Sequence, residues 1–270
     1  MGRPPRGDRA RVSDRAGVVT TADGADLAWR QTGAGTRELL LIAGQGVSAT
    51  SWDPVLPALT AVGRVTVYDH RGIGGSTVGE AAEWSTRSLA RDAATVIEAL
   101  DIAPAAVIGH SMGGRVAQWL AIDRPELVDR LVLVSTTGGD ARGMRREDAA
   151  TSALANGTGD VLAPYFFSDA YIADNPHAIS LFTRRDAVIP VRRGHFQASS
   201  THDAWDELAR ITAPTLVVHG ADDRITPPEN GRRVAASVPG ATLVEVPGAR
   251  HAPQLDTEAA LTAIVDFVRG

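Results

Sequence analysis

The hydrophobic and polar positions of the chain follow two different periods in turn. Residues 38–44 (ELLLIAG) and 105–109 (AAVIG) are continuous apolar runs, which are typical of strands buried on both faces of a parallel sheet. Between these runs lie apolar residues spaced three or four positions apart, as on one face of a helix: Leu89, Ala93, Val96, Ile97 and Leu100. Strands that alternate with helices form βαβ units, which build a parallel sheet with helices on both faces. The pattern therefore predicts an α/β fold.

Further segments complete the predicted sheet. Residues 15–32 contain two β-prone runs around Asp23-Gly24, a dipeptide typical of a tight hairpin turn. Other strands are predicted at residues 64–69, 130–135, 215–220 and 241–246. We therefore expect a doubly wound, mostly parallel sheet of about eight strands.

The alternation stops between residues 138 and 211. This segment contains helical fragments, turn residues and a set of aromatic side chains: Tyr165, Phe166, Phe167, Phe182 and Phe196. A long segment without strands, set between two strands, is most simply an inserted helical cap. The predicted core then comprises residues 16–137 and 212–270. Residues 1–15 are rich in Arg, Pro and Gly, and we expect them to form a disordered basic tail.

Composition narrows the possible functions. The chain has 270 residues, of which 44% are hydrophobic, enough for one domain with a large core. Its formal charge of -5 and pI of about 5.8 argue against nucleic acid as a partner. It contains no cysteine, which excludes thiol nucleophiles, disulfides and zinc–thiolate sites. No run approaches the roughly 20 apolar residues of a membrane helix, and the charged N-terminal residues do not resemble a signal peptide, so we expect a cytoplasmic protein without membrane contact.

One short motif carries the strongest chemical signal. Residues 109–113 (GHSMG) fit G-x-S-x-G and lie between a predicted strand and a predicted helix. In such a turn the flanking glycines leave room for a strained serine backbone, so that Ser111 stands above the carboxyl edge of the sheet. The amide of Met112, at the start of the helix, would favour negative charge beside the serine.

A serine needs an activating base and an acid that orients the base. Asp223 follows the strand predicted at 215–220, and His251 follows the strand predicted at 241–246. Because parallel strands end at one edge of a sheet, both side chains are expected near Ser111. The neighbouring Asp222 is the competing candidate for the acid.

Together these segments resemble the α/β-hydrolase superfamily, in its branch with a serine nucleophile. The elbow at Ser111 is accompanied, in the expected order, by YDHRGIGGS (68–76), HGADDRITP (219–227) and PGARHAPQ (247–254). Within the superfamily the chain is most similar to small esterases, enol-lactonases and carbon–carbon bond hydrolases. The resemblance implies Ser111 as nucleophile, His251 as base and Asp223 as acid, and it implies no metal or organic cofactor.

The resemblance also implies a second oxyanion donor in the loop after residues 38–42. Many relatives carry His-Gly before the donor, whereas this chain has Ala43-Gly44-Gln45-Gly46. The backbone amide of Gln45 can still donate, since no side chain is needed. In the loop after residues 64–68, we expect hydrogen bonds of Asp69 and Arg71 to tie the loop down.

Several side chains are candidates for contact with substrate, each with a structural alternative. They are Trp52, His110, Phe166, Phe167 and Phe196. His110 is expected to pack into the surroundings of the elbow, and the aromatic residues are equally typical of core or of cap packing. His219 is interpreted as a packing residue at a strand end.

These observations predict a serine hydrolase that cleaves a carboxylic ester or lactone of a small molecule through an acyl-enzyme intermediate. Thioester hydrolysis or acyl transfer, with an acidic carrier protein as a possible partner, and carbon–carbon bond cleavage remain alternatives on the same triad. A small-molecule receptor or a non-hydrolytic cyclase could use the same pocket. The sequence leaves the oligomeric state open.

Overall fold

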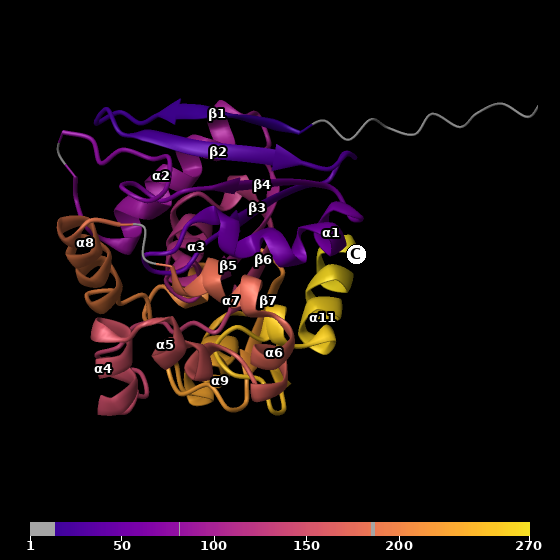
Figure 1. The fold of residues 1–270 in the computed structure, drawn as a ribbon. Helices are drawn as coiled ribbons and strands as arrows, with labels where there is room; N and C mark the ends of the chain where they lie inside the picture. Colours follow the sequence, from indigo (N-terminus) through magenta and orange to yellow (C-terminus); the bar gives the residue numbers. More distant parts are fainter. Residues whose placement is uncertain (1–13, 81, 185–186) are drawn as a thin grey trace, which may run out of the picture.

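An eight-stranded sheet forms the centre of the molecule (Figure 1). The computed structural model describes residues 14–80, 82–184 and 187–270. The strand order is β1-β2-β4-β3-β5-β6-β7-β8; β2 pairs antiparallel with both β1 and β4, and all other neighbouring strands pair parallel. The strands are β1 (Arg15–Thr20), β2 (Asp26–Thr32), β3 (Glu38–Ile42), β4 (Arg64–Tyr68), β5 (Ala105–His110), β6 (Val128–Val134), β7 (Thr215–Gly220) and β8 (Thr242–Val246). This confirms the predicted fold class.

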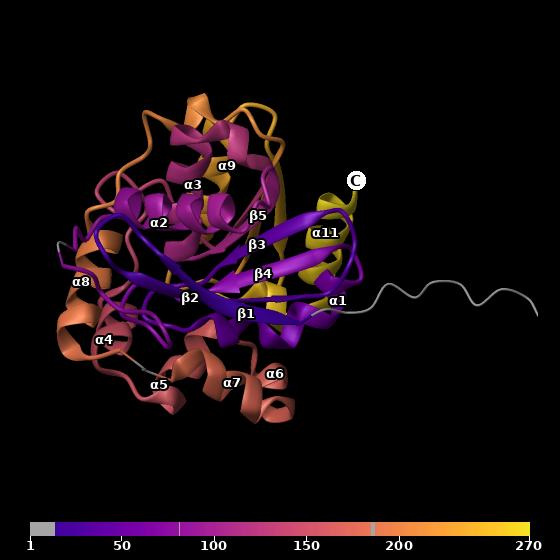
Figure 2. The ribbon, with the colours of Figure 1, turned by 90° about the horizontal axis from the view of Figure 1, so that it is seen from above.

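Helices cover both faces of the sheet (Figure 2). On one face α2 (Thr86–Ala99), α3 (Met112–Asp123) and α9 (Pro228–Ser237) pack against every second residue of the strands. On the other face α1 (Leu56–Thr60) and α11 (Glu258–Arg269) cover the alternate residues. The central strands are therefore buried on both sides, which explains why they are continuous apolar runs in the sequence.

The apolar face predicted for residues 89–100 belongs to α2. Its inward side chains are buried, and Leu100, which follows the helix, is partly buried. The helix begins with a capping box, in which the Ser85 side chain accepts from the Ser88 amide at 2.9 Å.

The sequence SWDP at residues 51–54 predicts a helix with Asp53 as N-cap and Pro54 at the first helical position, and this prediction is wrong. A 3₁₀ helix, η1 (Ala49–Val55), already begins at Ala49 and includes Pro54. The Asp53 carboxylate pairs with Arg30 on β2 instead of capping a helix.

A helical insertion separates β6 from β7, as predicted. It contains α4 (Asp148–Asn156), α5 (Gly159–Phe166), α6 (Asp169–Asp174), α7 (Pro176–Thr183) and α8 (Ile189–Ser200). The two ends of the insertion meet, since the Ala204 amide donates to the Gly138 carbonyl at 2.7 Å. The remaining short helices are η2 (Pro125–Leu127), η3 (Leu208–Arg210) and α10 (Pro253–Asp256).

The expected N-terminal tail cannot be compared in full, because residues 1–13 lie outside the described residues. Its expected last residue, Arg15, is already the first residue of β1. Within the described residues, no helix combines the length and the apolar composition that crossing a bilayer requires.

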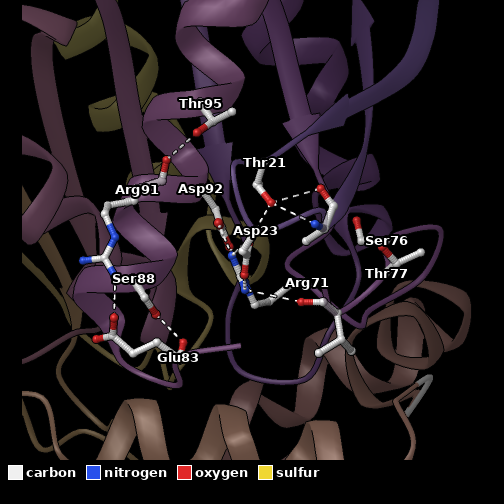
Figure 3. A network of polar contacts seen from close by, with 12 residues as sticks. Thr21, Asp23, Arg71, Ser76, Thr77, Glu83, Ser88, Arg91, Asp92 and Thr95 are labelled. Carbon is white, nitrogen blue, oxygen red and sulfur yellow. Dashed lines mark hydrogen bonds and ion pairs between the residues drawn. The ribbon is translucent and has the colours of Figure 1, made fainter. Parts of the chain in front are cut away.

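A buried ion-pair network fastens the loop after β4 to two other elements (Figure 3). The Arg71 guanidinium, 4% exposed, donates to both carboxylate oxygens of Asp92 on α2, at 2.7 and 2.5 Å. It also donates to Asp23 in the β1–β2 turn at 2.8 Å. The hydrogen bonds that Arg71 donates to the carboxylates of Asp92 and Asp23 raise its pKa, so it stays charged. The network confirms the expected anchoring of this loop.

We predict that Asp92→Ala lowers the free energy of unfolding by about 3 kcal/mol, because it leaves a buried guanidinium with only part of its partners. Urea denaturation of wild type and variant measures the difference. The matched control is Glu245→Ala, which removes the partner of the half-exposed Arg232. This variant is expected to lose at most about 1 kcal/mol. Equal losses in the two variants would contradict the structural role given to Arg71.

Candidate active site

The backbone at Ser111 is held in a strained conformation between β5 and α3. Its φ is +55°, a region that residues with a side chain rarely adopt. Glycines on both sides make the sharp turn possible. A Cβ on Gly109 would collide with the Gly113 backbone, and a Cβ on Gly113 would collide with the carbonyls of Ile42 and Ala43. The turn therefore lifts the serine above the sheet edge.

The structure brings Ser111, His251 and Asp223 together. The His251 ring places Nε2 2.9 Å from Ser111 Oγ and Nδ1 2.7 Å from Asp223 Oδ2. Both Asp223 and His251 are buried, at 3% and 1% exposure, whereas Ser111 is partly exposed. This is the geometry in which an imidazole can take a proton from the serine while a carboxylate holds the ring.

The Asp223 carboxylate is held by several donors. Its Oδ1 accepts the backbone N–H groups of Ile225 and Thr226, each at 2.8 Å. Burial alone would raise the pKa of Asp223, but His251 and His219 outweigh this, and the pKa lies well below its ordinary value. The competing Asp222 is exposed, so the buried partner of the histidine is Asp223.

The loop after β3 and the start of α3 offer the two backbone amides expected to bind an oxyanion, those of Gln45 and Met112. In the described part of the chain, neither the Gln45 amide nor the Met112 amide donates to a protein acceptor. Two side chains from the loop after β4 hold this segment. His70 Nε2 donates to the Ala43 carbonyl at 3.0 Å, and Asp69 Oδ1 accepts the Ala49 amide at 2.7 Å. Sequence reasoning expected Asp69 to form hydrogen bonds in this region, but it did not indicate the contact of His70 with Ala43.

Comparison with known proteins adds to this geometry. The family model described as "Serine aminopeptidase, S33" matches residues 36–258, which include Ser111, Asp223 and His251. The chain belongs to the α/β-hydrolase superfamily. Its resemblance to this superfamily, inferred from the sequence motifs, is thereby confirmed.

Three similar proteins illustrate the range within this superfamily. "Putative non-heme bromoperoxidase BpoC" of Mycobacterium tuberculosis is 32% identical over 258 residues, covering 90% of this chain and 97% of that protein. A hydrolase from Pseudomonas aeruginosa has a TM-score of 0.80 at 30% identity, covering 94% of this chain and 98% of the other. The enol-lactonase from Burkholderia xenovorans has a TM-score of 0.78 at 25% identity, with coverages of 91% and 97%.

His110 of this hydrolase lies beneath the site and packs into the surroundings of the elbow, as expected, so its candidacy for contact with substrate is corrected. It is 1% exposed, and its Nε2 donates to the His251 carbonyl at 2.8 Å. Its ring packs 5.0 Å from the His251 ring and 5.3 Å from the Phe182 ring. Burial lowers the pKa of His110 to about 3, so the ring is a neutral donor that supports the His251 backbone.

The structure separates the four aromatic candidates for contact with substrate. Phe166 is partly exposed, with its ring 5.1 Å from that of His251, so it remains a candidate. Phe167 is fully buried and stacked on Tyr171, and Trp52 is 2% exposed in the core beneath β3 and β4. Phe196 on α8 is 60% exposed and faces solvent. Burial therefore corrects the expectations for Trp52 and Phe167, whereas contact of Phe196 with substrate stays a prediction.

Hydrogen bonds connect the insertion directly to the loop that carries His251. The His251 amide donates to the Tyr165 carbonyl at 3.3 Å, and the Ala252 amide donates to the Phe166 carbonyl at 2.9 Å. Arg250 donates to the carbonyls of Pro164 and Phe167 at 3.0 and 2.6 Å. No periodic pattern in the sequence indicates these contacts, because most of the acceptors are backbone carbonyls.

Across residues 14–80, 82–184 and 187–270, no group of three or more His, Cys, Asp or Glu side chains is placed to hold a metal ion.

Buried neutral histidines make the stability of the hydrolase sensitive to acid. Burial lowers the pKa values of both His110 and His195 from 6.5 to about 3. Between these values the unfolded chain binds protons that the folded chain cannot, so the free energy of unfolding falls as the pH falls. Each ring contributes about 1.4 kcal/mol per pH unit.

We predict that His195→Gln unfolds with a shallower pH dependence than wild type between pH 6.5 and 5, where one titrating ring accounts for about 2 kcal/mol. Urea denaturation at several pH values measures the slope. His177 is exposed, so His177→Gln is the control and keeps the wild-type slope. Identical slopes for His195→Gln and wild type would contradict the burial of a neutral ring.

Proposed function

We propose that this serine hydrolase cleaves a carboxylic ester or lactone of a small molecule through an acyl-enzyme intermediate. The observation that carries the proposal is the pair of contacts around His251, 2.9 Å to Ser111 Oγ and 2.7 Å to Asp223 Oδ2. This series of contacts supports Ser111 as nucleophile, His251 as base and Asp223 as the carboxylate that orients the base.

The first half of the reaction forms the acyl-enzyme. Ser111 Oγ attacks the substrate carbonyl carbon while His251 Nε2 takes the hydroxyl proton, and ionised Asp223 stabilises the imidazolium. The amides of Gln45 and Met112 donate to the oxyanion of the tetrahedral intermediate. One such donor typically lowers the barrier by about 3 kcal/mol. When the intermediate collapses, the carbon–oxygen bond to the leaving group breaks and His251 returns the proton to the departing alkoxide.

The second half regenerates the enzyme. A water molecule attacks the acyl carbonyl, His251 takes one of its protons, and the new intermediate collapses to the acid and Ser111 hydroxyl. For a lactone the released alcohol and acid belong to the same product molecule. The fold similarity to an enol-lactonase supports a lactone as one candidate.

The aromatic rings beside His251 favour an apolar group in the part of the substrate next to the base. The Phe166 ring lies 5.1 Å from the His251 ring and 5.4 Å from the Phe182 ring. Both aromatic rings come from the insertion. An apolar wall suits an uncharged ester or lactone better than a charged one.

We predict that Ser111→Ala lowers turnover of p-nitrophenyl esters by at least about a thousandfold, because the three side chains act as a unit. The matched control is Ser135→Ala at the end of the adjacent strand, where φ is also positive, at +48°. This variant is expected to keep ester turnover. A fluorophosphonate probe should label Ser111 in wild type and in Ser135→Ala. Near-normal turnover by Ser111→Ala, or labelling of another residue, would contradict the proposal.

A substrate panel distinguishes the proposed reaction from its alternatives. Turnover of esters and lactones above that of acyl thioesters and vinylogous diketones supports it. Preference for a thioester would indicate acyl transfer chemistry, with an acidic carrier as partner, and preference for a diketone would indicate carbon–carbon cleavage. Tight ligand binding without any turnover would indicate a receptor, and product formation unaffected by Ser111→Ala would indicate a non-hydrolytic cyclase.

A further inference from the structure

A second imidazole lies against the carboxylate of Asp223. His219 is in β7, four residues before Asp223, and is fully buried. Its Nε2 lies 2.7 Å from the Thr226 carbonyl oxygen and 3.3 Å from Asp223 Oδ2. One nitrogen of this ring therefore faces two acceptors at once.

These contacts define which nitrogen carries the proton. Nε2 must carry hydrogen, because a carbonyl oxygen and a carboxylate oxygen can only accept. Nδ1 is buried and has no hydrogen-bond partner in the described part of the chain. It packs against Gly231, where a Cβ would overlap it. His219 is therefore the neutral tautomer with hydrogen on Nε2, and its N–H is shared mainly with Thr226 and more weakly with Asp223.

We propose that His219 is a positioning residue that holds the Asp223 carboxylate in the orientation needed to bind His251. With it, the carboxylate has two backbone amides on Oδ1 and two imidazoles facing Oδ2. The bond from His219 to the Thr226 carbonyl also closes the turn whose amide binds Oδ1. His219 thus fixes both the carboxylate and the turn on which it sits. This inference rests on the proposed function.

The role predicts a defined kinetic change when the N–H is removed. His219 is fully buried and cannot touch substrate, so KM should change little. Without the His219 N–H, Oδ2 loses one of the groups that hold it, so the carboxylate orients His251 less firmly and kcat should fall. Misplacement of a catalytic group by about 1 Å can cost about a hundredfold in rate.

A shift in the pH profile would separate this role from simple loss of packing. The titratable groups around Asp223 are His251, His219 and His110. Without the His219 N–H, less of the carboxylate charge is shared, so Asp223 attracts a proton on His251 more strongly. The acid limb of kcat/KM should therefore move to higher pH in the variant.

The experiment compares His219→Leu with His219→Gln in the full chain. Leucine keeps the volume and removes the donor, whereas the glutamine amide can place N–H groups near the position of Nε2. The control is His202→Leu, another buried histidine, which contacts Thr86 Oγ1 at 2.8 Å and Gln118 Oε1 at 3.1 Å, away from Asp223. Each protein is assayed for kcat, KM and pH profile with the best ester of the panel, and for thermal unfolding.

We expect His219→Leu to lose at least about tenfold in kcat with little change in KM, and to show the shifted acid limb. We also expect broadening of the downfield proton resonance of the His251–Asp223 hydrogen bond. His219→Gln should recover most of kcat, and His202→Leu should keep kcat and the wild-type pH profile. A folded His219→Leu with wild-type kcat and pH profile overturns the inference. An equal loss of kcat in His219→Leu and His219→Gln, with the acid limb of the pH profile unshifted, also overturns it. That result would mean that His219 acts only through packing.

If wild type takes up the fluorophosphonate but His219→Leu behaves as wild type, only this inference fails. If wild type neither hydrolyses the panel nor takes up the probe on Ser111, the proposed function fails first. The two failures are therefore distinguishable in the same set of proteins.

Discussion

The close approach of β5, α3 and the end of β3 is the constraint on which the site depends. The turn at Ser111 has no room for side chains at Gly109 or Gly113, because backbone atoms occupy the positions of both Cβ atoms. Ser111 adopts a strained positive φ, and this conformation places it above the sheet edge. The packed strands β3 and β5 and the helix α3 maintain this strained conformation. They thereby fix the position of the Ser111 side chain, near which His251 and Asp223 must lie.

Buried neutral histidines hold the loops around the site in place. His70, His110, His195 and His219 are all buried, and each places Nε2 at a backbone carbonyl oxygen, of Ala43, His251, Arg71 and Thr226 respectively. A buried N–H that satisfies a carbonyl costs far less than a buried charge, so these rings can fix loops in a region of low dielectric. Loops that end at the sheet edge thereby keep a defined shape without forming regular secondary structure. The same burial makes the fold sensitive to acid.

Much of this architecture could be predicted from the sequence, for identifiable reasons. Buried parallel strands are continuous apolar runs, so the strand positions and the helical insertion followed from the pattern alone. The elbow at Ser111 has a local motif, and parallel strands must bring Asp223 and His251 to the same edge.

Contacts that depend on side-chain direction or on backbone acceptors could not be predicted in this way. The aromatic character of Trp52, Phe167 and Phe196 does not say which side of a helix faces the site, and the structure turns these three toward core, cap interior and solvent. His219 has no motif of its own, because its partners are a backbone carbonyl and a carboxylate four residues away. The hydrogen bonds between the insertion and the His251 loop could not be predicted for the same reason.

The most direct test of the account is to trap the covalent intermediate. Wild-type protein is mixed with an activated ester, quenched in acid within one turnover and digested, and the peptides are analysed by mass spectrometry. The account predicts an acyl group on the peptide that contains Ser111, and its loss when the quench is delayed until the ester is exhausted. Release of product with no acylated peptide at any time, or an acyl group on a different residue, would contradict it.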